Sequence, residues 1–235
     1  MFISGLQKLT LLDYPGRVAC TVFTGGCDFR CPFCHNASLV IPERLEEGKT
    51  APIQEDEILA FLKKRIGILD GVAVTGGEPL LHRETAVFLE KVKNMGYSVK
   101  LDTNGSYPDR LKEIVRNGLA DRVAMDIKSS PSDYPAVVGI PGYDISRVEE
   151  SKDFLLSGVV EYEFRTTVVK GLHTTDSLLS AAEWIKGAKE YYLQQYKDSG
   201  DIVNSEGLAA FSEEEMQQLA DRVREIIPTV ELRGV

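Results

Sequence analysis

Residues 24–34 read Thr-Gly-Gly-Cys-Asp-Phe-Arg-Cys-Pro-Phe-Cys, so three of the four cysteines of the chain, Cys27, Cys31 and Cys34, fall within eight positions. The segment directly follows an apolar run at residues 18–23, which has the length and composition of a buried strand. In a reducing environment, clustered cysteines indicate metal binding, and thiolates favour iron–sulfur clusters or zinc. The sequence therefore predicts a metal centre at the end of a strand.

Two kinds of metal centre compete for these thiols. A structural zinc site needs four closed ligands, so His35 or Cys20 would have to complete it, and the second, distant ligand pair typical of zinc sites is missing. Three thiolates suit a [4Fe–4S] cluster better, because each holds one iron and the fourth iron stays open to a substrate. We therefore predict a [4Fe–4S] cluster on Cys27, Cys31 and Cys34. Cys20 lies within the predicted strand, and we interpret it as a buried small hydrophobic residue.

Strand-like and helix-like segments alternate through the rest of the chain. Apolar or alternating runs predict strands at residues 18–23, 72–75, 97–101, 123–128, 162–169 and 191–195, with a further short candidate at 230–232. Helical spacing places apolar residues on one face in three segments, marked by Ile58, Leu62 and Ile66, by Phe88, Val92 and Met95, and by Leu178, Ala182 and Ile185. The last helix begins at a capping box of Ser212 and Glu215 and ends before Pro228.

This alternation predicts the fold class. Strands that alternate with helices form right-handed βαβ units and a parallel sheet. Six units fall short of the eight that close a full barrel, so we expect an α/β fold with a partial (β/α)6 barrel rather than a doubly wound sheet. The 235 residues suit a single domain, 1–235, and the proline-rich segment 129–142 is interpreted as a turn region rather than a linker.

Three further motifs follow predicted strands. They are Thr75-Gly76-Gly77-Glu78-Pro79, Leu101-Asp102-Thr103-Asn104-Gly105 and Met125-Asp126-Ile127-Lys128. Each motif alone is typical of an ordinary turn. Parallel α/β folds, however, assemble their sites at the carboxyl ends of strands, where these motifs and the cysteines all lie. We therefore expect the four segments to form one site.

Composition limits the partners and the location. A formal net charge of −9 and a pI near 5.0 argue against a nucleic-acid partner, because such binding depends on Lys and Arg neutralising phosphates. No segment has the apolar length of a membrane span. Residues 1–5 lack the features of a secretory signal, so we expect a cytoplasmic protein with reduced thiols and no membrane partner.

The C-x3-C-x2-C spacing, followed by the Gly-Gly-Glu-Pro motif, resembles the radical S-adenosylmethionine (SAM) superfamily. The resemblance implies that the open iron of the cluster binds the amino and carboxylate groups of SAM. An electron from the cluster then splits the sulfonium and gives a 5′-deoxyadenosyl radical. The implied cofactors are the [4Fe–4S] cluster and SAM, and no catalytic residue beyond the cluster and cofactor is implied.

The resemblance also assigns residues to the cofactor, namely Phe33, His35, Gly76, Gly77, Glu78, Asp102, Asp126 and Lys128. It implies that Phe33 lies against the adenine, that His35 orients the cofactor or the cluster loop, and that the Gly-Gly-Glu-Pro motif receives the methionine ammonium. The two aspartates resemble those that help to hold a monovalent cation in glycyl-radical-activating enzymes, where Lys128 would line the cofactor site. Roles for Arg165, His173, Gln194, Gln195 and Cys20 as functional residues stay open.

The stretch from Gly5 to Val40 resembles the activating proteins of anaerobic ribonucleoside-triphosphate reductase. This resemblance implies abstraction of hydrogen from one glycine of that partner, which leaves a stable glycyl radical, and it implies a low-potential electron donor such as flavodoxin or ferredoxin. Two alternatives stay open. One is a radical SAM enzyme that acts on a small molecule or a peptide, and the other is a non-enzymatic zinc-binding adaptor.

Overall fold

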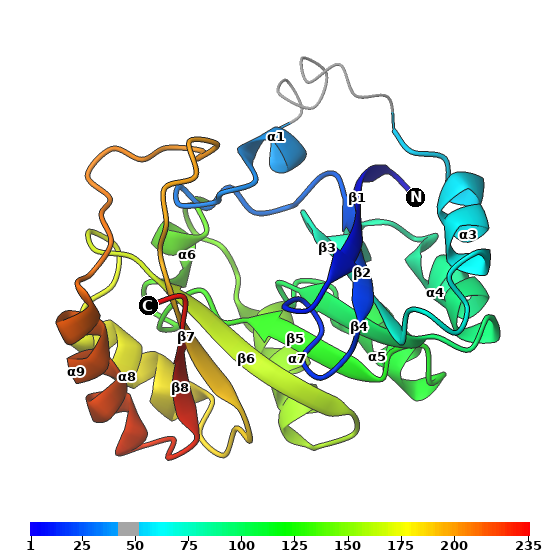
Figure 1. Cartoon of the computed structure of the whole chain (residues 1–235). Helices are drawn as coiled ribbons and strands as arrows, with labels where there is room; N and C mark the ends of the chain where they lie inside the picture. Colours follow the sequence, from blue (N-terminus) through cyan, green and yellow to red (C-terminus); the bar gives the residue numbers. More distant parts are fainter. Residues whose placement is uncertain (42–51) are drawn as a thin grey trace.

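The computed structural model describes residues 1–41 and 52–235 and contains one curved sheet of eight strands (Figure 1). The strands follow the sheet in chain order, from β1 to β8. Strands β2 to β8 are parallel, and β1 pairs antiparallel with β2. Their bounds are β1 Ile3–Thr10, β2 Ala19–Thr24, β3 Gly71–Gly76, β4 Ser98–Thr103, β5 Arg122–Asp126, β6 Glu161–Val168, β7 Tyr191–Gln195 and β8 Val230–Arg233.

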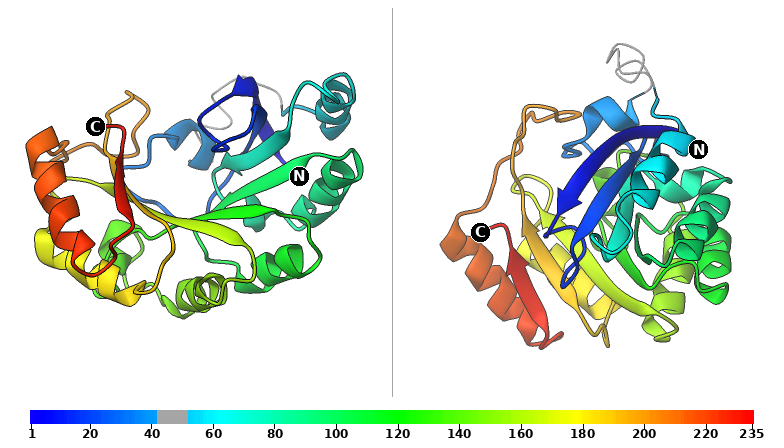
Figure 2. Two further views of the ribbon diagram at one scale, coloured as in Figure 1. Left: turned by 60° about the horizontal axis from the view of Figure 1, so that its bottom comes forward. Right: turned by 45° about the vertical axis from the view of Figure 1, so that its right-hand side comes forward.

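Helices cover the convex side of this sheet (Figure 2). Their bounds are α1 Ala37–Val40, α3 Glu55–Lys63, α4 Thr85–Asn94, α5 Pro108–Arg116, α6 Tyr134–Val137, α7 Ser146–Leu156, α8 Thr175–Trp184 and α9 Glu213–Arg224, with a 3-10 turn, η1, at Pro79–Leu81. The described strands leave β1 and β8 as the two edges of the sheet. The fold is therefore a partial barrel that is open on one side, as predicted.

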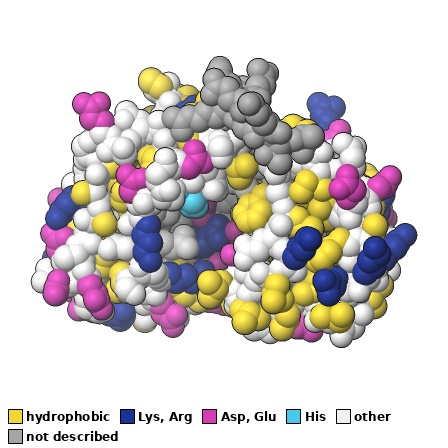
Figure 3. Space-filling model, turned by 45° about the horizontal axis from the view of Figure 1, so that its top comes forward, with side chains coloured by type: hydrophobic (Ala, Val, Ile, Leu, Met, Phe, Trp, Pro, Cys, Tyr) yellow, Lys and Arg dark blue, Asp and Glu magenta, His cyan; other side chains and the backbone are white. Residues whose placement is uncertain are grey.

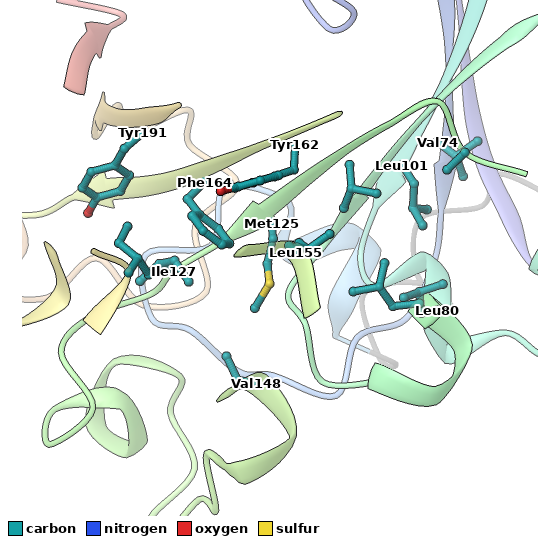
Figure 4. Close-up of a cluster of buried hydrophobic side chains, with 14 of the residues drawn as sticks. Val74, Leu80, Leu101, Met125, Ile127, Val148, Leu155, Tyr162, Phe164 and Tyr191 are labelled. Carbon is teal, nitrogen blue, oxygen red and sulfur yellow. The ribbon is translucent and has the colours of Figure 1, made fainter. Parts of the chain in front are cut away.

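The core lies between the sheet and the helices. Met125 on β5 and Phe164 on β6 are fully buried on the side of α7, which contributes Val148 and Leu155 (Figure 4). Leu101 on β4 is fully buried beside Leu80 of η1. Because side chains alternate along a strand, the residues between these apolar positions face the other, concave side of the sheet. Several of those residues on β4 to β6 are charged, among them Lys100, Asp102, Asp126, Glu163 and Arg165.

Most of the predicted elements are confirmed. The six predicted strands correspond to β2 to β7, the candidate at 230–232 corresponds to β8, and α9 begins with the predicted capping box of Ser212 and Glu215. The sequence does not predict β1, because Gly5, Gln7 and Lys8 interrupt its apolar pattern. The predicted position of Ile66 on the buried face of a helix is wrong, because α3 ends at Lys63 and the Ile66 side chain is 57% exposed.

The segment 129–142 contains the short helix α6 and belongs to the same fold. Within the described ranges, no helix has the length and apolar character that crossing a membrane requires. The parallel strands all place their carboxyl ends on one edge of the sheet, and this edge carries the predicted motifs.

Candidate cofactor site

A cavity of about 320 Å³ lies at the carboxyl ends of the strands. Figure 3 looks into a hollow that holds acidic and basic side chains, with a histidine at its mouth. Of the residues predicted for the cluster and the cofactor, all except Glu78 line the cavity. They are Cys27, Cys31, Cys34, Phe33, His35, Gly76, Gly77, Asp102, Asp126 and Lys128. The fold thus brings together four motifs that are separated by up to about a hundred residues in the sequence.

The three cysteines of the loop after β2 face this cavity together. Cys31 is 7% exposed, whereas Cys27 and Cys34 are partly exposed. Burial raises the pKa of the Cys31 thiol to about 12, and burial likewise raises the pKa of Cys27 and Cys34. Buried thiolates need a compensating positive charge, and bound iron supplies one. Hydrogen bonds to Cys27 Sγ from the N–H of Phe29 (3.4 Å) and from Asn104 Nδ2 (3.7 Å) also favour a thiolate.

These thiols fit a cluster by their chemistry and placement. Across residues 1–41 and 52–235, no three His, Cys, Asp or Glu side chains are gathered around one metal-ion position. A [4Fe–4S] cluster needs a different arrangement, because each of its thiolates binds a separate iron. Cys20 is fully buried in the apolar core on β2, and it does not line the cavity.

The two glycines of the Gly-Gly-Glu-Pro motif permit close packing against the start of the cluster loop. A Cβ atom on Gly77 would lie 1.9 Å from the carbonyl oxygen of Gly26, and Gly76 has φ +118 beside the backbone of Thr24. The N–H of Gly77 donates to the Thr24 carbonyl (2.8 Å), and the N–H of Glu78 donates to that of Gly26 (2.8 Å). Only glycine allows this approach, so the motif fixes the first cysteine relative to β3.

Glu78 lies behind the cavity wall rather than in it. The side chain is fully buried. Its carboxylate accepts hydrogen bonds from the backbone N–H groups of Leu80 (2.9 Å) and Asn104 (2.7 Å) and from the hydroxyl of Thr103 (2.9 Å). Burial raises the pKa of this carboxyl group to about 8. In this structure Glu78 holds the turn after β4 against η1, and a direct contact with SAM remains a prediction.

A chain of alternating charges crosses the concave face of β4 to β6. Arg165 Nη1 lies 3.0 Å from Asp102 Oδ2, and Arg165 Nε lies 2.9 Å from Asp126 Oδ1. Lys100 Nζ lies 2.6 Å from Asp102 Oδ1, and Lys128 Nζ lies 2.8 Å from Asp126 Oδ2. Three cations thus face two carboxylates in this chain of contacts, and Lys128 and Arg165 line the cavity, where they could contact an anionic ligand group such as a carboxylate.

The same contacts set the ionisation of the site. Burial alone would raise the pKa of Asp126, but the charges of Arg165 and Lys128 outweigh burial and hold this pKa well below its usual range. Burial lowers the pKa of Lys128, but the charge and hydrogen bond of Asp126, together with the nearby Cys31 thiol, raise this pKa above its usual value. All four oxygens of Asp102 and Asp126 already contact a cationic group. A monovalent cation would share these oxygens with the cationic side chains, and it remains a prediction.

Several residues left open by the sequence acquire a position here. Arg165 and Gln194 line the cavity. Gln195 does not, and its Nε2 donates to the carbonyl of Phe211 (2.6 Å). His173 is 4% exposed, packs edge-on against Phe33 with ring centroids 6.3 Å apart, and binds backbone groups of two strand ends.

Sequence reasoning missed Asn104 and Asp13 as cavity residues. Asn104 Nδ2 donates to Asp28 Oδ1 (2.9 Å), next to the first cysteine. The Asp-Thr-Asn-Gly motif contains Asn104, but only its aspartate, Asp102, is predicted as a site residue. Asp13 precedes β2 by six residues, and nothing in its local sequence indicates that the chain turns back over the concave face.

Comparison with known proteins identifies the family. Residues 21–185, which include all four motifs, match the profile of the Radical SAM superfamily. The chain belongs to the radical SAM superfamily. Membership implies a [4Fe–4S] cluster and SAM. The three thiols fit the cluster, and the cationic side chains of Lys128 and Arg165 in the cavity wall fit the carboxylate of SAM.

Individual relatives extend the match beyond this region. A protein of Methanocaldococcus jannaschii, provisionally named a glycyl-radical enzyme activating enzyme, is 28% identical over 99% of this chain and 96% of its own length. The pyruvate formate-lyase-activating enzyme of Clostridium pasteurianum is 30% identical over 58% of this chain and 57% of its own. Among solved structures, a domain of the pyruvate-formate lyase-activating enzyme of Bacteroides vulgatus superposes with a TM-score of 0.57, at 20% identity over 70% of this chain and 99% of that one. The last likeness concerns the radical SAM fold alone.

Proposed function

We propose that this radical SAM enzyme is an activating enzyme that generates a glycyl radical on a partner protein. The observation that carries the proposal is the near full-length match to the M. jannaschii protein, which reaches beyond the cofactor motifs to both ends of the chain. A shared cofactor site alone would match only the region of the motifs. The activating name of the C. pasteurianum relative supports the same class of reaction.

In this proposal Cys27, Cys31 and Cys34 hold the cluster, and Lys128 and Arg165 offer positive charge to the carboxylate of SAM. The cofactors supply the radical chemistry, in which one electron cleaves SAM to methionine and a 5′-deoxyadenosyl radical, and that radical takes one hydrogen atom from a glycine Cα to become 5′-deoxyadenosine. The protein binds and orients the reacting groups. Phe33, which is 5% exposed and whose ring centroid lies 5.9 Å from Lys128 Nζ, offers an apolar face for the adenine.

The open side of the barrel supports a protein substrate. A glycine on a folded partner must be delivered on a mobile loop that enters this opening, and its Cα must come within roughly 3–3.5 Å of the reacting carbon. The end of β1 and the turn after it, at the open edge, carry the exposed side chains of Leu9 (57%), Leu11 (67%) and Leu12 (88%). Asp13, the next residue, lines the cavity. We propose that the partner docks on these leucines, because they form an exposed apolar patch on the edge of the sheet that borders the open side of the barrel.

We propose anaerobic ribonucleoside-triphosphate reductase as the partner, on the resemblance of residues 5–40, and a low-potential donor such as flavodoxin or ferredoxin as the source of the electron. The test mixes the reduced enzyme and SAM with this reductase and records the electron paramagnetic resonance spectrum. An organic radical doublet is expected, and it should be lost when the target glycine is replaced by alanine. If no glycyl radical enzyme gives the doublet while a small molecule or peptide stimulates 5′-deoxyadenosine release, the activating role is wrong.

A further inference from the structure

The cluster loop is held by a segment from the far end of the chain, residues 198–205, which we call the β7–α9 strap. It runs beside the segment that leads into α1 (Figure 1). The N–H of Val203 donates to the carbonyl of Cys34 (3.2 Å), and the N–H of Asn204 donates to the carbonyl of Pro32 (2.9 Å). These bonds fix the backbone between the last two cysteines and at Cys34 itself.

Asp201 is the strap residue whose side chain bonds to the same region. Its carbonyl accepts from the N–H of Ala37 (3.2 Å). Its carboxylate accepts from the N–H of Ser38 (3.0 Å and 3.2 Å to the two oxygens) and from the Ser38 hydroxyl (2.7 Å). The carboxylate is thus fixed four residues beyond Cys34, and its negative charge contributes, after burial, to the raised pKa of that thiol.

We propose that Asp201 is a positioning residue for the cluster loop and that its negative charge lowers the reduction potential of the cluster. Reduction adds one negative charge to the cluster, and a fixed carboxylate nearby disfavours that charge more than it disfavours the oxidised state. A lower potential makes the reduced cluster a stronger reductant toward the sulfonium of SAM. The inference depends on the cluster assignment, but it does not depend on the proposed partner or substrate.

Positioning and charge can be separated because three substitutions change them differently. Asp201→Asn removes the charge but keeps an oxygen that accepts from Ser38. Ser38→Ala removes the hydroxyl bond and keeps the charge. Asp201→Ala removes both. Asp198→Asn is the matched control, because Asp198 is an exposed strap acid whose carboxylate accepts only a local bond, from the N–H of Gly200 (2.8 Å), in the part of the chain that the structure describes.

The experiment uses anaerobically reconstituted full-length protein and two measurements. A redox titration, followed by the paramagnetic signal of the reduced cluster, gives the reduction potential, and release of iron to a chelator gives the rate of cluster loss. Asp201→Asn is expected to raise the potential while iron release stays near the wild-type rate. Asp201→Ala should raise the potential and speed iron release about tenfold, the scale of one lost charge-assisted hydrogen bond. Ser38→Ala should speed release without a change in potential.

Three results would overturn the inference. An unchanged potential in Asp201→Asn would exclude the charge effect. A wild-type rate of iron release from Asp201→Ala would exclude the positioning role, and an equal change in Asp198→Asn would show that any charge on the strap acts in the same way. Because Asp201→Asn is isosteric, its potential tests the charge effect even if Asp201→Ala fails to fold. Failure of glycyl radical formation in the wild type would overturn the proposed function and leave these readouts intact.

Discussion

His173 Nε2 lies 2.8 Å from the carbonyl oxygen of Lys128, so this histidine after β6 supports the backbone of the lysine that we propose offers charge to the cofactor. The N–H of Val169 donates to His173 Nδ1 (3.1 Å). With Nδ1 accepting, Nε2 carries the proton and donates to Lys128. The imidazole must therefore be neutral, since protonation would place two donors, Nδ1–H and the N–H of Val169, against each other.

The contribution of His173 to stability should depend on pH. Burial lowers its pKa below the usual value of about 6.5. At pH values between the lowered pKa and about 6.5, the unfolded state binds more protons at His173 than the folded state does. The stabilisation that His173 contributes is therefore complete above this pH range and is lost as the pH falls through it. The difference between the unfolding free energies of wild type and His173→Gln, measured in denaturant from pH 8 to pH 5, should shrink as the pH falls. A constant difference would contradict the neutral imidazole.

Lys128→Ala and Asp126→Ala should weaken SAM binding without loss of iron. Removal of one charge-assisted hydrogen bond costs about 1.5–3 kcal/mol, or roughly 10-fold to 150-fold in the dissociation constant. Equilibrium binding of SAM, together with iron content, measures both effects. Lys91→Ala is the control, because Lys91 forms an exposed ion pair with Glu55 (2.7 Å) on the helical surface. If either site variant binds SAM with wild-type affinity, the replaced residue does not belong to the SAM site.

Replacement of Cys27, Cys31 or Cys34 by alanine should abolish the paramagnetic signal of the reduced cluster. Wild-type protein reconstituted without oxygen should carry about four irons and four sulfides per chain, since three thiolates suffice for the cluster. Cys20→Ala should retain the signal, because this thiol lies in the apolar core. Zinc in place of iron, or loss of the cluster in Cys20→Ala, would show that the ligand assignment is wrong.

Leu11→Ser combined with Leu12→Ser should weaken activation of the partner. Both side chains are mostly exposed, so the free energy of unfolding should change by no more than about 0.5 kcal/mol. We expect the concentration of partner needed for half-maximal radical formation to rise severalfold, while SAM cleavage without partner stays unchanged. Val159→Ser is the control, because Val159 is similarly exposed (53%) but precedes β6, which lies inside the sheet rather than at its open edge. Equal activation by the double variant would exclude docking on the leucines.

The sequence by itself determined strands β2 to β8, the partial barrel and the family. Apolar runs and capping boxes are local patterns, and they were sufficient for β2 to β8 and for α9. Clustered cysteines and Gly-Gly-Glu-Pro are recognisable because their chemistry needs neighbouring residues at fixed spacing. The carboxyl ends of parallel strands then meet on one edge, which is why residues 27–34 and 125–128 could be placed in one site.

Only the tertiary structure decided what each side chain does there. Arg165 pairs with Asp102 and Asp126 because β4, β5 and β6 are neighbouring strands whose register places these three residues together. No local sequence pattern predicts which arginine contacts two aspartates on neighbouring strands. Glu78 turned away from the cavity because three donors of the turn after β4 and of η1 converge on it. Asp201 reached the cluster loop across more than 160 residues of sequence. Such contacts depend on which elements pack together and on which face of a strand a residue occupies, and both are set by the whole barrel rather than by neighbours in the chain.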